Sequence, residues 1–301
     1  MKFLTIQEAY QRKFDRQKSI KQLEYHAGGH CVHIGRISPG CLSCFLPNRF
    51  SYNIFTGTKC NLNCPYCFEN TFQVPEKKLN PETMSQIISN SRIPGYDPIK
   101  VSFTGGGEPL LYPETIEEYM KLFKEIEIRT KKKPWYYIYT NGILADANML
   151  VRMRDLGFDE IRFHLGASNF SRNVYRNIKK AVKVFKTISI ETPAWPLHRK
   201  KLFEMLPIIN DLGVKHLNLG EIEVTSHNYA AISKIFPQGE IYQCYTIHLH
   251  DQGLTYDIIE ETLKRKYSFS VLDCNCFVKS IQRSDGKFTY HQALKGLCAK
   301  Y

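Results

Sequence analysis

The sequence of 301 residues lacks an uncharged apolar run of the roughly eighteen residues that a membrane-spanning helix needs. Residues 1–25 carry charges throughout and lack the apolar core of a signal peptide. Low-complexity tracts and internal repeats with a period of about 20 to 50 residues are also missing, which argues against disorder and against a solenoid. We therefore expect a globular protein of the cytoplasm that does not enter a membrane.

The composition is ordinary for a folded domain except in charge and in cysteine. An apolar fraction of 43% and an aromatic fraction of 13% suit one large domain, or a mid-sized domain with appendages. The net charge of +12 favours encounter with polyanions or acidic peptides, and we expect the runs Lys131–Lys133 and Lys179–Lys180 to be solvated helix ends. Ten cysteines without an export signal indicate metal ligation or catalysis rather than disulfides.

One short stretch brings three cysteines together. Cys60, Cys64 and Cys67 have the spacing Cys-x3-Cys-x2-Cys. Three thiolates on one loop suit three irons of a cubane iron–sulfur cluster and leave the fourth iron open for chemistry. Structural zinc usually takes four protein ligands, often as two separated pairs, so the triplet suits zinc less well. On the loop alone, a cluster, a zinc site and buried thiols all remain open.

A second candidate metal site precedes that loop. Residues 1–29 have the apolar spacing of one amphipathic helix that ends at Gly28-Gly29. A Pro-Gly turn at 39–40 then delivers a Cys-x2-Cys pair that can fold back toward an earlier cysteine. The candidate metal ligands are Cys31, Cys41 and Cys44, with His30 and His33 nearby. The alternative is that these cysteines are reduced structural thiols.

From residue 50 onward, strand and helix patterns alternate six times. The predicted strands are Phe50–Thr56, Ile99–Thr104, Trp135–Tyr139, Glu160–Leu165, Thr187–Glu191 and Val214–Leu219. The helices between and after them are predicted to begin at Pro81 and to cover 113–129, 146–156, 173–185 and 199–212. Alternation of this length predicts parallel strands with right-handed crossovers, and thus an α/β fold with a partial (β/α)6 TIM-like barrel.

The motifs collect where such a barrel binds ligands. The cysteine loop follows the first strand, Gly105–Pro109 follows the second, and Thr140–Gly142 follows the third. Carboxyl ends of parallel strands meet at one face, so these segments are expected to lie together. Residues 221–301 form an extension with a helix at 251–266 and a strand at 267–272, in which Cys274 and Cys276 suit either chelation or core packing. The predicted division is thus 1–49, 50–220 and 221–301.

This combination of motifs resembles the radical S-adenosylmethionine (radical SAM) superfamily over about residues 50 to 220. The resemblance implies a [4Fe–4S] cluster on Cys60, Cys64 and Cys67, with S-adenosylmethionine chelated at the fourth iron. Reduction would cleave the sulfonium to methionine and a 5′-deoxyadenosyl radical, which abstracts hydrogen from a substrate. An electron donor such as flavodoxin or ferredoxin is implied as a partner.

The resemblance also implies which residues surround the cofactor. Gly105, Gly106 and Gly107 would let the backbone approach the methionine end, and Glu108 would accept a hydrogen bond from its amino group. Tyr66 would pack on the adenine, and His164 would face the ribose. Weaker candidates, because strand ends also need polar caps, are Thr140, Asn141, Glu191 and Asn218.

The superfamily serves many reactions, so the substrate is a separate question. The space before residue 50 is too small for a cobalamin-binding domain. Extra cysteines and a basic surface favour hydrogen abstraction from a peptide or protein side chain, with an auxiliary iron–sulfur cluster or a mononuclear metal at the 31–44 site. The alternatives are RNA modification, activation of a glycyl-radical enzyme, and a basic zinc protein that binds nucleic acid, with nucleic acid not favoured.

Overall fold

The computed structural model describes residues 1–26, 31–42, 50–68, 81–104, 106–244 and 246–276. Its contacts divide the chain into two compact units. We call residues 49–191 the central unit, and residues 1–48 with 192–301 the flanking unit. The domain boundary predicted at residue 220 does not coincide with this division by contacts, and it stays a prediction.

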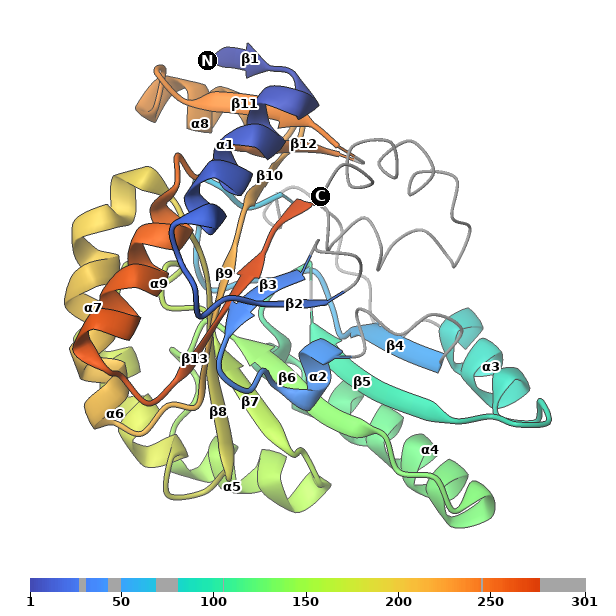
Figure 1. Ribbon diagram of the computed structural model, residues 1–301. Helices are drawn as coiled ribbons and strands as arrows, with labels where there is room; N and C mark the ends of the chain where they lie inside the picture. Colours follow the sequence, from blue (N-terminus) through green and yellow to red (C-terminus); the bar gives the residue numbers. More distant parts are fainter. Residues whose placement is uncertain (27–30, 43–49, 69–80, 105, 245, 277–301) are drawn as a thin grey trace. The chain divides into compact units, whose positions relative to one another are not determined.

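The central unit is built on five parallel strands (Figure 1). They are β4 (Phe50–Phe55), β5 (Pro98–Thr104), β6 (Trp135–Thr140), β7 (Glu160–Phe163) and β8 (Thr187–Pro193), which pair in this order. The helices of this unit are α3 (Pro81–Asn90), α4 (Pro113–Thr130), α5 (Ala147–Leu156) and α6 (Arg172–Ala181). The predicted α/β class with a parallel sheet is confirmed.

Caps and buried faces explain where these helices lie. Asp146 precedes α5 and its carboxylate accepts from the Met149 backbone N–H at 2.9 Å, while Gly157 ends the helix with φ of +102°. Both are ordinary helix signals, since an N-cap carboxylate satisfies a free N–H and glycine adopts the left-handed conformation without a Cβ penalty. In α4 one face is buried, and each such side chain stabilises by about 1.5–3 kcal/mol. Its buried residues are Ile116, Tyr119, Met120, Phe123 and Ile126.

The flanking unit contributes strands to two sheets. One has the order β1-β11-β12-β10, from β1 (Lys2–Leu4), β10 (Ile222–Val224), β11 (Glu240–Gln243) and β12 (Ile247–Leu249). The other strands of the unit run in the order β2-β3-β13-β9, from β2 (Glu24–His26), β3 (Cys31–Ile34), β9 (His216–Gly220) and β13 (Ser270–Cys274). Its helices are α1 (Ile6–Lys18), α2 (Pro39–Leu42), α7 (Arg199–Asp211), α8 (Tyr229–Ile235) and α9 (Leu254–Arg265).

Several predicted elements of this unit were wrong in extent. The single helix over residues 1–29 is instead β1, α1 and β2, because β1 pairs in parallel with β11 and Thr5 starts α1 with a capping box. Glu8 completes that box, since its carboxylate accepts from the Thr5 backbone N–H at 2.7 Å. The Pro-Gly turn at 39–40 is the short helix α2. Strands β1, β3 and β10 to β12 were missed because three or four residues show no clear alternation.

Helix α1 carries a buried lysine that the sequence pattern did not reveal. The Lys13 ammonium lies 3.1 Å from Glu221 Oε1, 3.5 Å from Asp273 Oδ2 and 3.8 Å from Asp251 Oδ1, and all four side chains are at most 3% exposed. Burial opposes its charge, yet these carboxylates raise the pKa of Lys13 well above its ordinary value. Tyr256 O–H also donates to Asp273 Oδ2, at 2.8 Å. This buried ion cluster fixes α1 to β13 and to the residues after β9 and β12.

Among the described residues, the helices are all too short or too polar to cross a membrane.

Candidate cofactor site

The cysteine loop follows β4 and forms a turn. The Cys67 backbone N–H donates to the Cys64 carbonyl oxygen at 3.0 Å, which closes the turn around Pro65 and Tyr66. Cys60, Cys64 and Cys67 are half-buried and free. Burial raises the pKa of the Cys64 thiol to about 12, and its neighbours Cys67 and Cys60 add to that effect. The three thiols thus share one short loop after β4.

The glycine-rich segment after β5 packs directly against the start of this loop. The Glu108 backbone N–H donates to the Lys59 carbonyl oxygen at 2.8 Å. A Cβ added to Gly107 would lie 2.0 Å from that same oxygen, so only glycine fits there. Gly106 is buried, whereas Gly105 lies outside the described residues.

Glu108 cross-links two strand ends with its carboxylate. Oε1 accepts from Thr140 Oγ1 at 2.8 Å and from the Leu110 backbone N–H at 3.1 Å, and Oε2 accepts from the Asn141 backbone N–H at 2.7 Å. Thr140 Oγ1 also accepts from the Gly142 backbone N–H at 2.9 Å. Burial raises the pKa of Glu108 to about 7, while three donors and no acceptor hold the carboxylate form.

Because both carboxylate oxygens of Glu108 accept hydrogen bonds, even the conservative change to glutamine should lower the stability of the protein. Glu108→Gln replaces one carboxylate oxygen with an amide N–H₂ that faces donors only, so it leaves buried groups unpaired. We expect a loss of about 1–3 kcal/mol in the free energy of unfolding, measured by urea denaturation. Glu114→Gln is the control, because that side chain is 76% exposed and should change stability by less than about 0.5 kcal/mol. Equal stability of the two variants would contradict the cross-linking role.

Asn141 connects the end of β6 to the cysteine loop. Its Nδ2 group donates to Asn61 Oδ1 at 2.6 Å and to Cys60 Sγ at 3.8 Å, and its Oδ1 accepts from the Ile143 backbone N–H at 3.0 Å. The side chain is thereby fixed at both ends. Thr140 and Asn141, predicted as cofactor candidates, thus lie against Glu108 and Cys60.

Tyr66 of the cysteine loop stacks on His164, which directly follows strand β7. Their ring centroids lie 6.0 Å apart with an interplanar angle of 11°. His164 Nδ1 accepts from the Ala167 backbone N–H at 2.9 Å, and burial lowers the pKa of His164. The neutral ring therefore carries its proton on Nε2. Cys64 Sγ lies 3.8 Å from the Ala167 carbonyl oxygen, so the segment after β7 also contacts the cysteine loop.

Two predicted cofactor residues have other partners. Glu191 on β8 pairs with Arg162 of β7, with 3.2 Å between Oε2 and Nη1. Asn218 belongs to the flanking unit, where its Nδ2 donates to Cys41 Sγ at 3.3 Å. The structure therefore gathers seven of the ten predicted cofactor residues around the cysteine loop. They are Tyr66, Gly106, Gly107, Glu108, Thr140, Asn141 and His164.

Sequence reasoning missed a charged network on the strands of the central unit. Arg162 Nε donates to Glu160 Oε1 at 2.8 Å, and the guanidinium carbon lies 4.1 Å from the Tyr137 ring centroid. Trp135 Nε1 and Ser189 Oγ also donate to Glu160, at 2.8 and 2.5 Å. The sequence did contain a signal for this network, because Glu160 and Arg162 are opposite charges at alternate positions of a predicted strand. Alternate positions lie on one face of a strand.

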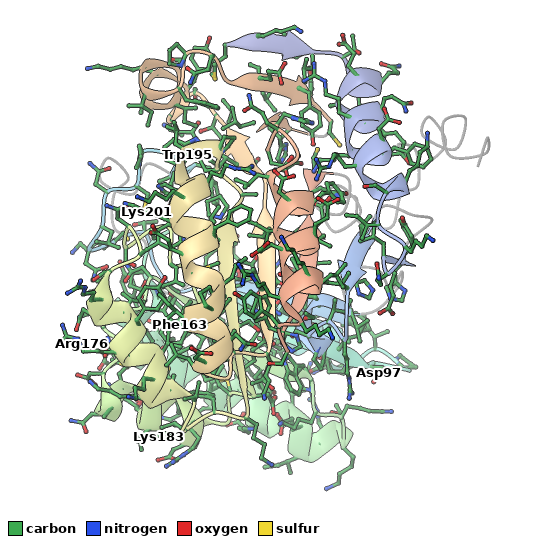
Figure 2. All side chains as sticks on the ribbon, turned by 60° about the vertical axis from the view of Figure 1, so that its left-hand side comes forward. Asp97, Phe163, Arg176, Lys183, Trp195 and Lys201 are labelled. Carbon is green, nitrogen blue, oxygen red and sulfur yellow. The ribbon has the colours of Figure 1, made fainter. Side chains whose placement is uncertain are left out.

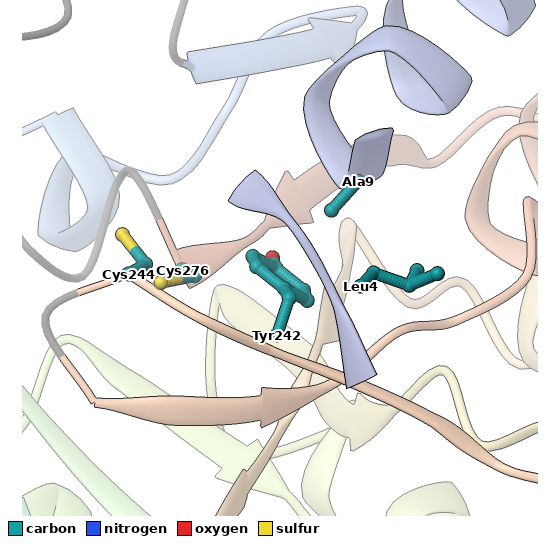
Figure 3. Close-up of a cluster of buried hydrophobic side chains, with 5 residues drawn as sticks. All are labelled: Leu4, Ala9, Tyr242, Cys244 and Cys276. Atoms are coloured by element: carbon teal, nitrogen blue, oxygen red, sulfur yellow. The ribbon is translucent and has the colours of Figure 1, made fainter. Parts of the chain in front are cut away.

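Four of the other cysteines are buried in apolar clusters. Cys31 and Cys41 are buried in one cluster with Ile37 and Leu272, while Cys44 lies outside the described residues. Figure 3 shows Cys244 and Cys276 beside Tyr242, in a cluster that Leu4 and Ala9 complete. Within the part of the chain that the structure describes, no three Cys, His, Asp or Glu side chains are placed to hold a metal ion. The three thiols on one loop suit an iron–sulfur cluster by donor type.

Comparisons with known proteins agree with this site. Residues 54–190 match the family described as the Radical SAM superfamily. The tungsten-containing aldehyde ferredoxin oxidoreductase cofactor-modifying protein of Pyrococcus furiosus is 26% identical over 179 residues, which are 54% of this chain and 47% of that protein. A probable GTP 3′,8-cyclase of Methanococcus aeolicus is 32% identical over 38% of this chain and 36% of its own length. The chain thus spans half or less of these two relatives.

Solved structures share the fold. Streptococcus suis SuiB bound to S-adenosylmethionine has a TM-score of 0.55 at 13% identity, over 78% of this chain and 53% of that one. The structure of anSMEcpe with bound AdoMet has a TM-score of 0.51 at 18% identity, over 74% of this chain and 63% of that one. Residues 54–190 are therefore identified as a radical SAM domain by their match to that family.

Proposed function

We propose that this protein is an enzyme that reductively cleaves S-adenosylmethionine and abstracts hydrogen from a peptide or protein side chain. The observation that carries the proposal is the convergence of four strand ends of the radical SAM domain on Cys60, Cys64 and Cys67. When bound there, a [4Fe–4S] cluster would supply the electron for that cleavage.

The residues of the chain then have distinct proposed tasks. Gly107, packed against the Lys59 carbonyl, holds the glycine-rich segment at the cysteine loop, where backbone groups can bind the methionine end of S-adenosylmethionine. Glu108 has both carboxylate oxygens engaged with protein donors, so its main task is to fix the second and third strand ends, with a remaining lone pair for the amino group. Tyr66 offers an aromatic face to the adenine, and His164 offers an Nε2–H donor to the ribose.

The proposed peptide substrate is supported by the charge of the chain and by one neighbour in fold. The net charge of +12 suits an acidic peptide. SuiB, a neighbour in fold, has been solved with its precursor peptide SuiA. The P. furiosus relative is a cofactor-modifying protein, so small substrates are the competing class. An auxiliary metal at Cys31, Cys41 and Cys44 belongs to the same proposal, as does a cytoplasmic location.

The test of the substrate class uses the anaerobically reconstituted protein with S-adenosylmethionine and dithionite. Acidic peptides encoded near the gene are added one at a time, with charge-scrambled versions as controls. We expect one peptide to raise the release of 5′-deoxyadenosine and to change in mass. If no peptide binds or alters that release, while co-purifying RNA binds with a steep salt dependence, the RNA-modifying alternative replaces this substrate class.

A further inference from the structure

Helix α6 presents a surface that contains only positive charge. Between Glu160 and Glu191 the sequence has no acidic residue. Six basic side chains on α6 and in the turn after it are exposed, while Val174, Ile178 and Ala181 are buried on the opposite face. The six are Arg172, Arg176, Lys179, Lys180, Lys183 and Lys186. We call them the α6 stripe. In Figure 2 the labelled members Arg176 and Lys183 lie on the outside of the ribbon.

The stripe differs from several other basic side chains of the central unit, which form ion pairs with carboxylates. Lys133 lies 2.6 Å from Asp159, and Arg152 Nε lies 2.7 Å from Glu117. Within the described residues, by contrast, no member of the stripe forms an ion pair with a carboxylate. Like charges at helical spacing of three and four residues repel one another. The stripe therefore destabilises the isolated chain. An anionic surface that covers the stripe would relieve this repulsion.

The stripe begins five residues after Ala167, which contacts the cysteine loop. Ser171 caps α6, with its Oγ accepting from the Asn173 backbone N–H at 3.2 Å. Four residues earlier, the Ala167 carbonyl contacts Cys64 Sγ, and His164 stacks on Tyr66. Arg172 lies five residues beyond Ala167, so the two Cα atoms are within about 18 Å even along an extended chain. A partner on the first turns of α6 thus approaches the proposed cluster site.

The shape of the stripe favours a protein over a nucleic acid. Proteins that hold single-stranded nucleic acid combine cations with exposed aromatic platforms. The aromatic residues of this segment, Tyr175 and Phe185, are half-buried and buried. Ten helical residues also extend only about 15 Å, which suits an acidic patch on a protein better than a duplex.

We propose that the α6 stripe is the docking surface for an acidic protein that carries single electrons. This inference rests on the proposed function, because cleavage of each S-adenosylmethionine consumes one electron. The carrier is oxidised by one electron, which is taken up as one carbon–sulfur bond of the sulfonium breaks. Complementary charge brings the carrier to the face of the domain at which that electron is needed.

The test compares two triple variants that change net charge equally. The stripe variant is Arg176→Glu, Lys179→Glu and Lys183→Glu. The control variant is Lys121→Glu, Arg154→Glu and Lys200→Glu, at exposed positions on other helices. Binding of an acidic flavodoxin to protein without a cluster is measured first, by titration at low and high salt. We expect the Kd to rise at least about tenfold in the stripe variant and to stay within about twofold in the control, with salt weakening the wild-type complex.

Release of 5′-deoxyadenosine is then measured with reduced flavodoxin and, separately, with dithionite. In the stripe variant the flavodoxin-driven rate should fall at least about tenfold while the dithionite-driven rate stays within about twofold of wild type. Equal flavodoxin binding by both variants, or a parallel fall in the dithionite rate, would overturn the docking surface. So would tighter binding of a 20-nucleotide RNA than of flavodoxin at the same salt. If the wild type releases nothing even with dithionite, the proposed function fails, and the binding titration still decides the surface.

Discussion

Replacing Cys60, Cys64 or Cys67 with alanine is expected to remove most of the bound iron and to abolish release of 5′-deoxyadenosine. Loss of an outer partner of a metal ligand already costs about 10–100-fold in metal affinity, so the loss of a ligand itself should cost more. Iron and sulfide are assayed after anaerobic reconstitution, together with the visible absorption of the cluster. In each variant we expect a fall of more than about a hundredfold in the rate of S-adenosylmethionine cleavage.

A matched thiol elsewhere controls for oxidation and for misfolding. Cys244 is 7% exposed and packs in the apolar cluster with Leu4 and Tyr242. Cys244→Ala removes one thiol from the core and should keep the iron of the cysteine loop and the cleavage of S-adenosylmethionine. If Cys64→Ala retained cleavage at the rate of Cys244→Ala, the loop would not be the cluster site.

Lys13→Met should destabilise the protein more than any other single change considered for the flanking unit. The substitution keeps the volume but leaves Glu221, Asp251 and Asp273 buried without their cation. Removal of one partner of a buried ion pair costs about 3–5 kcal/mol. Lys18→Met, at a side chain 53% exposed and 3.3 Å from Asp15, is the control and should cost less than about 1 kcal/mol. Urea denaturation at neutral pH measures both, and similar midpoints would contradict a stabilising role of the cluster.

The pH dependence of this variant has a defined sign. Burial raises the pKa of Glu221 and of Asp251, but the charge of Lys13 acts against burial and the net pKa of both is lowered. In the wild type these two carboxylates therefore stabilise the fold above their unfolded pKa values near 4, and this stabilisation is lost in stronger acid. Without Lys13 the buried carboxylates take up protons more readily than in the unfolded chain, so the variant gains stability as the pH falls. Burial raises the pKa of Asp273, so this carboxyl already favours the folded state as the pH falls, even in the wild type. The stability difference should therefore narrow between neutral pH and about pH 4.

The fold of the central unit could be predicted largely from local signals. Helix α5 has Asp146 at one end and Gly157 at the other, and each is a recognised cap. Strand β5 alternates the apolar residues Ile99, Val101 and Phe103 with polar ones, and glycines follow it in the sequence. Because parallel strands place their carboxyl ends on one face, the meeting of the 60–67, 106–109 and 140–142 segments followed from their order alone.

The flanking unit could not be predicted in the same way. Strand β1 has three residues and exists because β11, some 240 residues later, pairs with it. The burial of Lys13 could not be predicted from the sequence pattern, since its carboxylate partners on distant segments make that burial tolerable. Such elements are fixed by contacts distant in sequence, and periodicity carries no information about them.

The same distinction applies within the site. Cys60, Cys64 and Cys67 are visible from spacing, whereas the role of Glu108 as a cross-link needed the positions of Thr140 and Asn141. Asn218 looked equivalent to Asn141 as a polar residue at a strand, yet its contact is with Cys41 in the flanking unit. Residue type and position along a strand did not separate the two, because their partners come from other segments.

The central claim is that the cysteine loop of this radical SAM domain supports reductive cleavage of S-adenosylmethionine. The most direct measurement is anaerobic reconstitution of the full chain with iron and sulfide, reduction with dithionite, addition of S-adenosylmethionine, and quantification of 5′-deoxyadenosine by chromatography. We predict release by the wild type that the triple variant Cys60→Ala, Cys64→Ala and Cys67→Ala lacks. Well-reconstituted wild type that released no more 5′-deoxyadenosine than this variant would contradict the claim.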